Sequence, residues 1–277
     1  MKPLTDMKCS SQGRSHWTGR RITMHGRIEL FLLLSFLIFD CQAGTQLPQT
    51  IETVKQSVVA VGTYLPKRSP RGMFLGTGFV VGDGTVVATN AHVIPETLDV
   101  EHLEELAVFV RRGEKVGVEK VAVLAEDRVH DVALLKLTSV RLPVLRLGKA
   151  GKVREGQLYA FTGFPIGMVL GLYPVTHRGI VSAITPIAIP MLNAGQLNEK
   201  VLTRLRDPYP VFQLDATAYP GNSGSPLYEI ETGRVIGVIN KVFIKESKEN
   251  ILSKPSGISY AVPIEYVQKL LAEKGLR

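Results

Sequence analysis

A serine flanked by glycines has the surroundings that point most strongly to chemistry. Ser223 lies in the hexamer Gly221–Pro226 (GNSGSP). A nucleophilic serine needs space around its hydroxyl and backbone N–H groups directed at the developing oxyanion. Glycines on both sides allow a tight turn and a close approach of substrate, so we expect the N–H groups of Gly221 and Ser223 to be the oxyanion donors. The competing interpretation is a plain turn between strands, because the same residue types favour turns.

Two further residues could complete a catalytic set with this serine. His92 ends the segment Thr89–His92 (TNAH), where a neutral imidazole could act as general base. Asp131 precedes the apolar segment Val132–Leu137, and an acid in that position could orient the imidazole and stabilise its cation. Each residue alone is weak evidence, because a single histidine in an apolar stretch is usually structural and an aspartate before a strand is common.

Together the three residues predict a Ser-His-Asp triad. Their order along the chain is His92, Asp131, Ser223, which is the order of the chymotrypsin-type template and not that of α/β-hydrolases. Two of them fall in the first half of the chain and one in the second, so we expect the site in a cleft between the halves. Asp127 and Ser225 are nearby rivals. The apolar run begins directly after Asp131, however, and Ser223 is the serine that stands between asparagine and glycine.

The elements that would position these residues are short. The composition, with 26 glycines and 16 prolines, favours strands joined by turns over long helices. Apolar residues at helical spacing predict helices at 48–57 and at Ile264–Lys274. Pro143–Gly156 is interpreted as a linker and Pro186–Pro210 as a long loop. This pattern predicts antiparallel barrels or a sandwich. The expected strands are Val58–Tyr64, Met73–Val81, Thr85–Asn90, Leu106–Arg111, Lys115–Leu124, Val132–Leu137, Gln157–Gly163, Pro174–Thr185, Val211–Ala216, Ser225–Glu229, Arg234–Phe243 and Gly257–Val262.

Residues 1–43 have the pattern of an export signal. Arg27 precedes an apolar stretch, Leu30–Phe39, and small residues follow up to Ala43, after which we expect cleavage. The stretch is shorter than the about 20 residues that span a bilayer, so no stable membrane span is expected. A buried core helix and a lipid anchor on Cys41 are the alternatives. Met24 is a candidate for the true start. The mature protein, residues 44–277, is therefore expected to be secreted or periplasmic.

Charge and cysteine content argue against several classes of function. The formal net charge is +8, but no run of lysine and arginine is interleaved with aromatic residues, so nucleic-acid binding is not expected. The two cysteines, Cys9 and Cys41, both precede the expected cleavage site, which leaves none for disulfides or metal binding. His102, His130 and His177 lack metal-ligand spacing. We therefore expect no metal and no organic cofactor.

Six segments resemble, in order, the sequence blocks of HtrA/Deg-type proteases, a branch of the trypsin-like peptidases. They are Gly76–Val81 (GTGFVV), Thr89–Ile94 (TNAHVI), Asp131–Leu137 (DVALLKL), Asp215–Leu227 (DATAYPGNSGSPL), Gly233–Ile239 (GRVIGVI) and Gly257–Val267 (GISYAVPIEYV). The resemblance implies two six-stranded antiparallel β-barrels, at about 58–147 and 157–263, and a closing helix at 264–275. It also implies hydrolysis of peptide bonds in protein or peptide substrates, including unfolded ones, in protein quality control. The triad roles are carried onto His92, Asp131 and Ser223.

Departures from the family pattern limit what can be transferred. The chain ends soon after its last predicted helix, so no peptide-binding PDZ domain is expected, and the oligomeric state is left open. Ser225 stands where the family usually has glycine. Asn222 stands where digestive proteases carry the aspartate that pairs with a freshly cleaved N-terminus, so activation of that kind is not expected. Our hypothesis is that Pro186–Pro210 and neighbouring loops set the geometry of the oxyanion hole.

The primary specificity pocket is predicted to be uncharged. Thr217 and Ala218 should form its floor, and Ile239 stands where glutamyl endopeptidases carry a histidine. Neither trypsin-like preference for lysine and arginine nor preference for glutamate is supported. We expect cleavage after small or medium aliphatic residues, with Lys241 near the pocket as a complication.

Two other functions compete with that of an endopeptidase. The chain could be a non-catalytic binding protein or chaperone on the same fold, although such a protein would have no physical need to keep all three triad side chains. It could also be an esterase that uses the same chemistry on other acyl groups.

Overall fold

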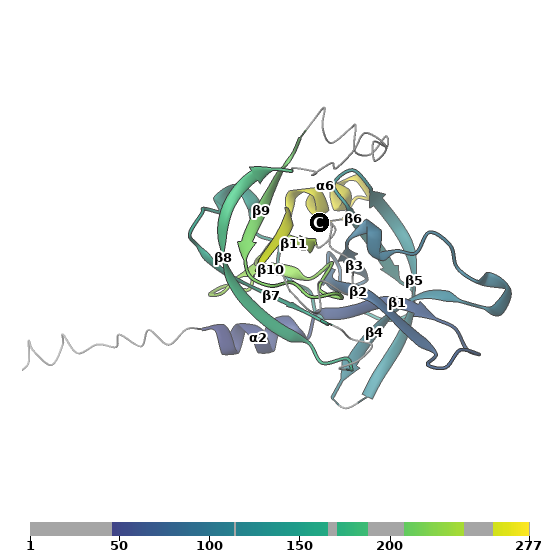
Figure 1. The fold of residues 1–277 in the computed structure, drawn as a ribbon. Helices are drawn as coiled ribbons and strands as arrows, with labels where there is room; N and C mark the ends of the chain where they lie inside the picture. Colours follow the sequence, from purple (N-terminus) through teal and green to yellow (C-terminus); the bar gives the residue numbers. More distant parts are fainter. Residues whose placement is uncertain (1–45, 114, 166–170, 188–207, 241–256, 277) are drawn as a thin grey trace, which may run out of the picture. The chain divides into compact units, whose positions relative to one another are not determined.

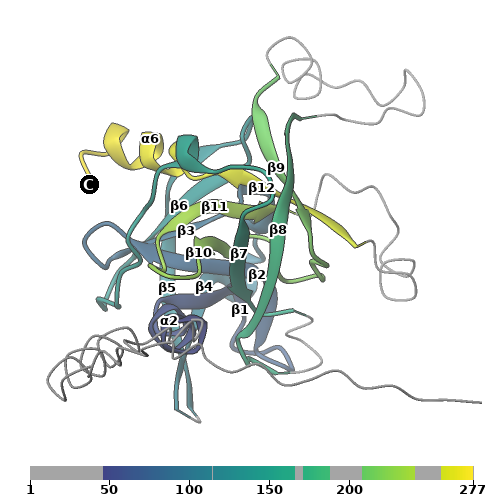
Figure 2. The same cartoon turned by 90° about the vertical axis from the view of Figure 1, so that its left-hand side faces the viewer.

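Twelve strands form two closed antiparallel barrels in the computed structural model, which describes residues 46–113, 115–165, 171–187, 208–240 and 257–276. Figure 1 shows the strands of the first barrel in purple to teal and those of the second in green to yellow, and Figure 2 shows them from the side. The predicted all-β class with two six-stranded barrels and short terminal helices is confirmed, and the sandwich alternative is wrong.

The first barrel has the strand order β1-β2-β3-β6-β5-β4 and is closed by pairing of β1 with β4. Its strands are β1 (Val58–Tyr64), β2 (Gly72–Val81), β3 (Val86–Thr89), β4 (Glu105–Arg112), β5 (Lys115–Asp127) and β6 (Val132–Leu137).

The second barrel repeats this topology. Traced from β7, its order is β7-β8-β9-β12-β11-β10, so each strand takes the place of its counterpart six strands earlier. Its strands are β7 (Leu158–Gly163), β8 (Val175–Pro186), β9 (Pro210–Asp215), β10 (Pro226–Glu229), β11 (Val235–Asn240) and β12 (Ile258–Pro263).

Strand β5 is longer than the sequence predicts. It was expected to end at Leu124, but after a register shift between Val123 and Ala125 its pairing with β6 continues to Asp127, opposite Val132. A β-bulge of this kind bends a strand and lets pairing resume beyond it. As a result, β5 and β6 are joined by a short turn of four residues that ends at Asp131.

In the described part of the chain, two α-helices of nine residues flank the barrels. They are α2 (Leu47–Lys55) and α6 (Glu265–Glu273). The buried face of α6 consists of Val267, Leu270 and Leu271. No helix in the described ranges has the length and apolar character required to cross a membrane. The export signal expected at 1–43, with Met24 and Cys41, lies outside the described residues, as do Lys241 and most of the loop Pro186–Pro210.

The strands of the first barrel carry apolar residues on both faces. In β1, Val59 and Val61 belong to an apolar cluster made up of first-barrel side chains, whereas Val58 and Ala60 belong to a second cluster shared with the second barrel and α6. Successive side chains of a strand point to opposite faces. The first cluster therefore fills the barrel interior, and the second holds the two barrels and the closing helix together.

We predict that Leu271→Ala lowers the free energy of unfolding by about 2–5 kcal/mol, the range for a buried leucine. Leu271 is 3% exposed and belongs to the cluster that joins the barrels. Urea unfolding followed by circular dichroism measures the change. Lys269→Ala, on the exposed side of the same helix, is the matched control and should change stability by less than about 0.5 kcal/mol. Equal unfolding midpoints for the two variants would contradict the packing of α6.

Candidate active site

His92 is held in a short helical turn that follows β3. Its neighbours Ala91 and Val93 are buried and anchor the turn, while the His92 side chain itself remains 25% exposed. The imidazole is therefore fixed at its backbone but reachable from solvent on one side. A general base needs this combination, because it must be oriented and must also meet a substrate.

Asp131 ends the turn between β5 and β6 in a left-handed conformation, with φ of +58°. Aspartate tolerates this region better than most residues. Its side chain is only 2% exposed, and its Oδ2 lies 2.7 Å from His92 Nδ1. The other carboxylate oxygen accepts the backbone N–H of His92 at 2.9 Å. The structure thus brings Asp131 to His92 by two contacts, whereas its rival Asp127 contacts His130.

A third donor reaches this carboxylate from the second barrel. Asn240, at the end of β11, donates its side-chain N–H to Asp131 Oδ2 at 2.6 Å. Burial raises the pKa of Asp131, but the hydrogen bonds and charge of His92 together with the Asn240 amide outweigh it, so the net pKa lies below the usual value. The carboxylate is consequently ionised at neutral pH although it is buried.

Ser223 lies in a turn of the second barrel that rests against the first. The backbone N–H of Thr77, in β2, donates to the Ser223 carbonyl at 2.8 Å. On the other side of the turn, Gly224 N–H donates to the carbonyl of Ile239, and Ile239 N–H donates to that of Ser225. Gly224 has φ of +88°, and a Cβ atom there would lie 1.9 Å from the Thr77 carbonyl oxygen. Only glycine allows this approach.

Gly221 and Ser223, whose backbone N–H groups are the predicted oxyanion donors, lie in and directly after a tight turn. Within the part of the chain that the structure describes, neither donates to a protein acceptor. Asn222 N–H donates to the Tyr219 carbonyl at 3.0 Å, and Gly221 has φ of +96°. A closed four-residue turn with proline second and a positive-φ glycine third is a type II β-turn.

The three predicted pocket residues lie on the segments that flank this turn. Ala218 is buried and Thr217 is partly exposed, between β9 and the serine turn. Ile239 is fully buried in β11, and its backbone is bonded to the serine turn. The rival nucleophile Ser225 is also fully buried, so its hydroxyl is less accessible than that of Ser223.

Two asparagines of the site were not singled out from the sequence. Besides Asn240, Asn90 donates its side-chain N–H to the Asp131 backbone carbonyl at 2.9 Å. Both residues are fully buried. The sequence does carry a signal for them, since each amide stands at the end of a largely apolar strand. A polar side chain that is buried in such a place needs a hydrogen-bond partner, so it indicates a polar group nearby.

Three other histidines lie in the described ranges, and each makes its own side-chain contacts. His102 pairs with Asp99 at the surface, and His130 pairs with Asp127 while stacking on Tyr266 at 3.8 Å between ring centroids. His177 stacks on Phe161, and burial lowers its pKa. Across the described ranges, no group of three or more His, Cys, Asp or Glu side chains could hold a metal ion.

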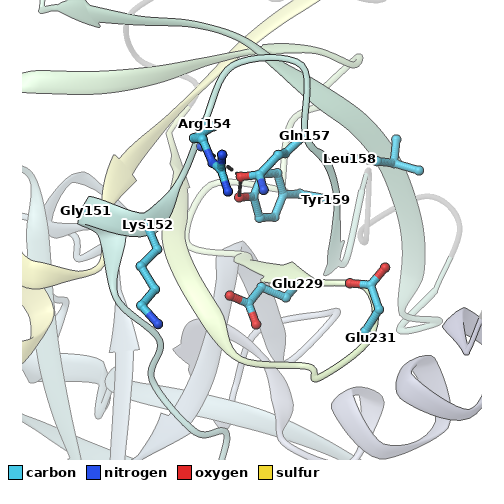
Figure 3. A pocket seen from close by; sticks show the side chains of 8 residues that line it. All are labelled: Gly151, Lys152, Arg154, Gln157, Leu158, Tyr159, Glu229 and Glu231. Atoms are coloured by element: carbon cyan, nitrogen blue, oxygen red, sulfur yellow. Dashed lines mark hydrogen bonds between the residues drawn. The ribbon is translucent and has the colours of Figure 1, made fainter.

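A separate polar cavity of 710 Å³ lies on the second barrel. Figure 3 shows Arg154, Gln157 and Tyr159 on one side of it and two glutamates, Glu229 and Glu231, on the other. The side-chain oxygen of Gln157, Oε1, accepts hydrogen bonds from Tyr159 Oη and from the Arg154 backbone N–H, both at 2.8 Å. None of the predicted site residues lines this cavity.

Comparison with known proteins gives a consistent result. Residues 76–238 match the family model described as "Trypsin-like peptidase domain". The chain is 33% identical over 192 residues to a protein of Halomonas elongata named "Probable periplasmic serine endoprotease DegP-like". The matched region covers 69% of this chain and 33% of that relative. It is 30% identical over 199 residues to "Serine protease HTRA2, mitochondrial" of Drosophila willistoni, covering 71% of this chain and 37% of the relative.

A solved structure shows the same fold. "HtrA-type protease AlgW with tripeptide" matches with a TM-score of 0.57 and 23% sequence identity, covering 83% of this chain and 64% of that chain. The chain spans about a third of the length of the curated relatives that it matches.

We predict that Asn240→Leu destabilises the protein at neutral pH and that the difference shrinks in acid. Loss of a hydrogen bond to a charged group costs about 1.5–3 kcal/mol. Because the folded pKa of Asp131 is lowered, its ionisation stabilises the fold above the unfolded pKa of about 3.9, and this contribution is lost as pH falls through the folded value. Removing the amide raises the folded pKa, so the contribution becomes smaller and is lost at a higher pH.

Urea unfolding at a series of pH values between neutral and acid measures this effect. Asp99→Asn, which alters an exposed Asp-His pair, is the control and should show little change. A stability difference between wild type and Asn240→Leu that is independent of pH would contradict the role assigned to the amide.

Proposed function

Because the chain belongs to the family of trypsin-like peptidases, we propose that it is a serine endopeptidase with His92, Asp131 and Ser223 as its catalytic triad. The observation that carries the proposal is the contact between His92 and Asp131. The buried carboxylate lies 2.7 Å from Nδ1 of an imidazole whose side chain is still partly open to solvent. The names of the relatives, which include serine endoproteases of the DegP and HtrA kinds, support the same activity.

The proposed reaction runs through an acyl-enzyme. Ser223 Oγ attacks the carbonyl carbon of the scissile peptide bond while His92 Nε2 accepts the hydroxyl proton. Asp131 keeps Nδ1 protonated and stabilises the imidazolium. The negative oxygen of the tetrahedral intermediate accepts hydrogen bonds from the backbone N–H groups of Gly221 and Ser223. The imidazolium then gives its proton to the leaving amine. A water molecule, activated by the same base, releases the acyl group and restores Ser223.

The proposed place of action is the periplasm or the exterior of the cell. The N-terminal pattern of residues 1–43 and the periplasmic designation of the DegP-like relatives support it. The proposed substrates are protein segments in extended or unfolded form. The solved HtrA-type protease described above was determined with a tripeptide, and this supports peptide binding by the present chain.

We predict that a fluorophosphonate probe labels the wild-type chain and that labelling disappears in Ser223→Ala and in His92→Ala. The probe reacts with serines activated by a neighbouring base. Ser225→Ala is the matched serine control, because that hydroxyl is fully buried. His102→Ala is the matched histidine control, because it removes an exposed Asp-His pair. Both controls should be labelled like wild type. Labelling that survives in Ser223→Ala would show that another nucleophile reacts.

The specificity pocket is proposed to accept small or medium aliphatic side chains, since Thr217, Ala218 and Ile239 carry no charge. Cleavage of a peptide library should therefore show aliphatic residues before the cleaved bond. Thr217→Asp should raise cleavage after lysine and arginine, because a carboxylate at the pocket floor attracts a cationic side chain. Thr232→Asp, in an exposed turn, is the charge-matched control and should leave the profile unchanged. A wild-type preference for lysine or arginine would refute the assignment.

A further inference from the structure

We propose that Thr77, a residue of the first barrel, is a positioning residue for the oxyanion hole of the second barrel. The inference rests on the proposed function and adds a residue that does not touch substrate. Thr77 is fully buried in β2, where it faces the serine turn.

Thr77 holds both residues that supply the oxyanion donors. Its backbone N–H donates to the Ser223 carbonyl at 2.8 Å, and its hydroxyl donates to the Gly221 carbonyl at 2.7 Å. The N–H groups of Gly221 and Ser223 themselves donate to no protein acceptor in the described part of the chain. One threonine therefore fixes the carbonyl of each donor residue and leaves each N–H available.

The direction of the hydroxyl is determined by a third group. Phe164, which follows β7, donates its backbone N–H to Thr77 Oγ1 at 3.1 Å. A hydroxyl has one proton to donate and can accept as well, so its proton is directed to the Gly221 carbonyl. No water competes for the bond, because Thr77 has 0% exposure. A buried hydroxyl with both roles satisfied is a rigid support.

The same residue connects the oxyanion hole to the base. Thr89 donates its hydroxyl to the Thr77 carbonyl at 2.7 Å, and Thr89 ends the strand that leads into the His92 turn. A short chain of hydrogen bonds thus joins the histidine segment, Thr77 and the serine turn. It crosses from one barrel to the other, so it sets the distance between the base and the oxyanion donors. A displacement of a catalytic group by about 1 Å can lower the reaction rate about 100-fold.

The surroundings leave no room for a larger side chain or for a shift of the turn. A Cβ atom at Gly163 would lie 2.9 Å from Thr77 Oγ1, and one at Gly76 would lie 2.9 Å from the Ser223 carbonyl oxygen. Valine has nearly the shape of threonine but no hydroxyl. Thr77→Val therefore removes the bonds to Gly221 and Phe164 and keeps the backbone bond to Ser223.

The test compares kcat and KM of wild type, Thr77→Val and Thr77→Ser on a quenched fluorescent peptide that the wild type cleaves. Active sites are counted by titration with a fluorophosphonate. We expect kcat of Thr77→Val to fall about 10- to 100-fold, less than the loss of an oxyanion donor itself. KM should stay within about twofold, because the support acts on the transition state. Thr77→Ser keeps the hydroxyl and should retain kcat within about threefold.

Thr162→Val is the matched control for loss of a buried threonine hydroxyl. Thr162 is also fully buried, and its hydroxyl contacts Tyr228 Oη and Thr176 Oγ1 at 2.8 Å, neither of which belongs to the serine turn. This variant should lose stability in urea without losing kcat. If Thr77→Val does not fold, Thr77→Cys replaces it. Its thiol is a weaker donor, and an intermediate kcat is expected.

The outcomes separate this inference from the proposed function. An active wild type whose kcat is unchanged in Thr77→Val or Thr77→Cys would overturn the role of Thr77 and leave the triad proposal standing. Equal losses of kcat in Thr77→Val and Thr162→Val would also overturn it, since a general loss of rigidity would then explain both. A folded wild type that neither cleaves peptides nor reacts with the probe would overturn both proposals.

Discussion

A buried carboxylate that draws its donors from both barrels is the constraint on which the site depends. Removing an ionised carboxyl group from water is costly unless hydrogen bonds replace the lost hydration. Asp131 receives the backbone N–H of His92, contacts its imidazole, and accepts an amide N–H from Asn240. The first two come from the first barrel and the third from the second. The cost of burying the carboxylate is therefore fully offset by hydrogen bonds only when the two barrels are docked.

The same junction carries Ser223, the proposed nucleophile, and the turn that holds the proposed oxyanion donors. Ile239, next to Asn240 in β11, is bonded through its backbone to the serine turn, and Thr77 of β2 is bonded to the other side of that turn. The turn is thus held between a strand of each barrel. Large apolar side chains from both barrels form the shared core behind it. Burial of apolar side chains, which is non-directional, holds the two barrels together, and directional hydrogen bonds align the serine turn between them. Both therefore act at the same surface between the barrels.

Features of the fold and the candidate site could be predicted where a short stretch of sequence carries their pattern, and not where they depend on residues far apart in the chain. His92, Asp131 and the Ser223 hexamer each stand beside a short apolar strand, and most strand positions followed from valine-rich runs between turn residues. Asn240 meets Asp131 across 109 positions, and the Thr77 hydroxyl meets Gly221 across 144. No local pattern encodes such pairs, because they arise only when the barrels pack. The extension of β5 beyond Leu124 was missed for a related reason, since a bulge interrupts the alternation that defines a strand.

The turn that carries the acid has its own support, and this gives the closing helix a part in the site. Asp131 adopts a left-handed backbone that the surrounding structure must stabilise. In the preceding residues, Asp127 accepts the N–H groups of Val129 and His130 at 3.0 Å each. The His130 ring stacks on Tyr266 of α6. Because α6 also packs into the shared core, the end of the chain braces the turn that presents the carboxylate. The strain at Asp131 is thereby offset by contacts far along the sequence, in keeping with the orienting role proposed for this carboxylate.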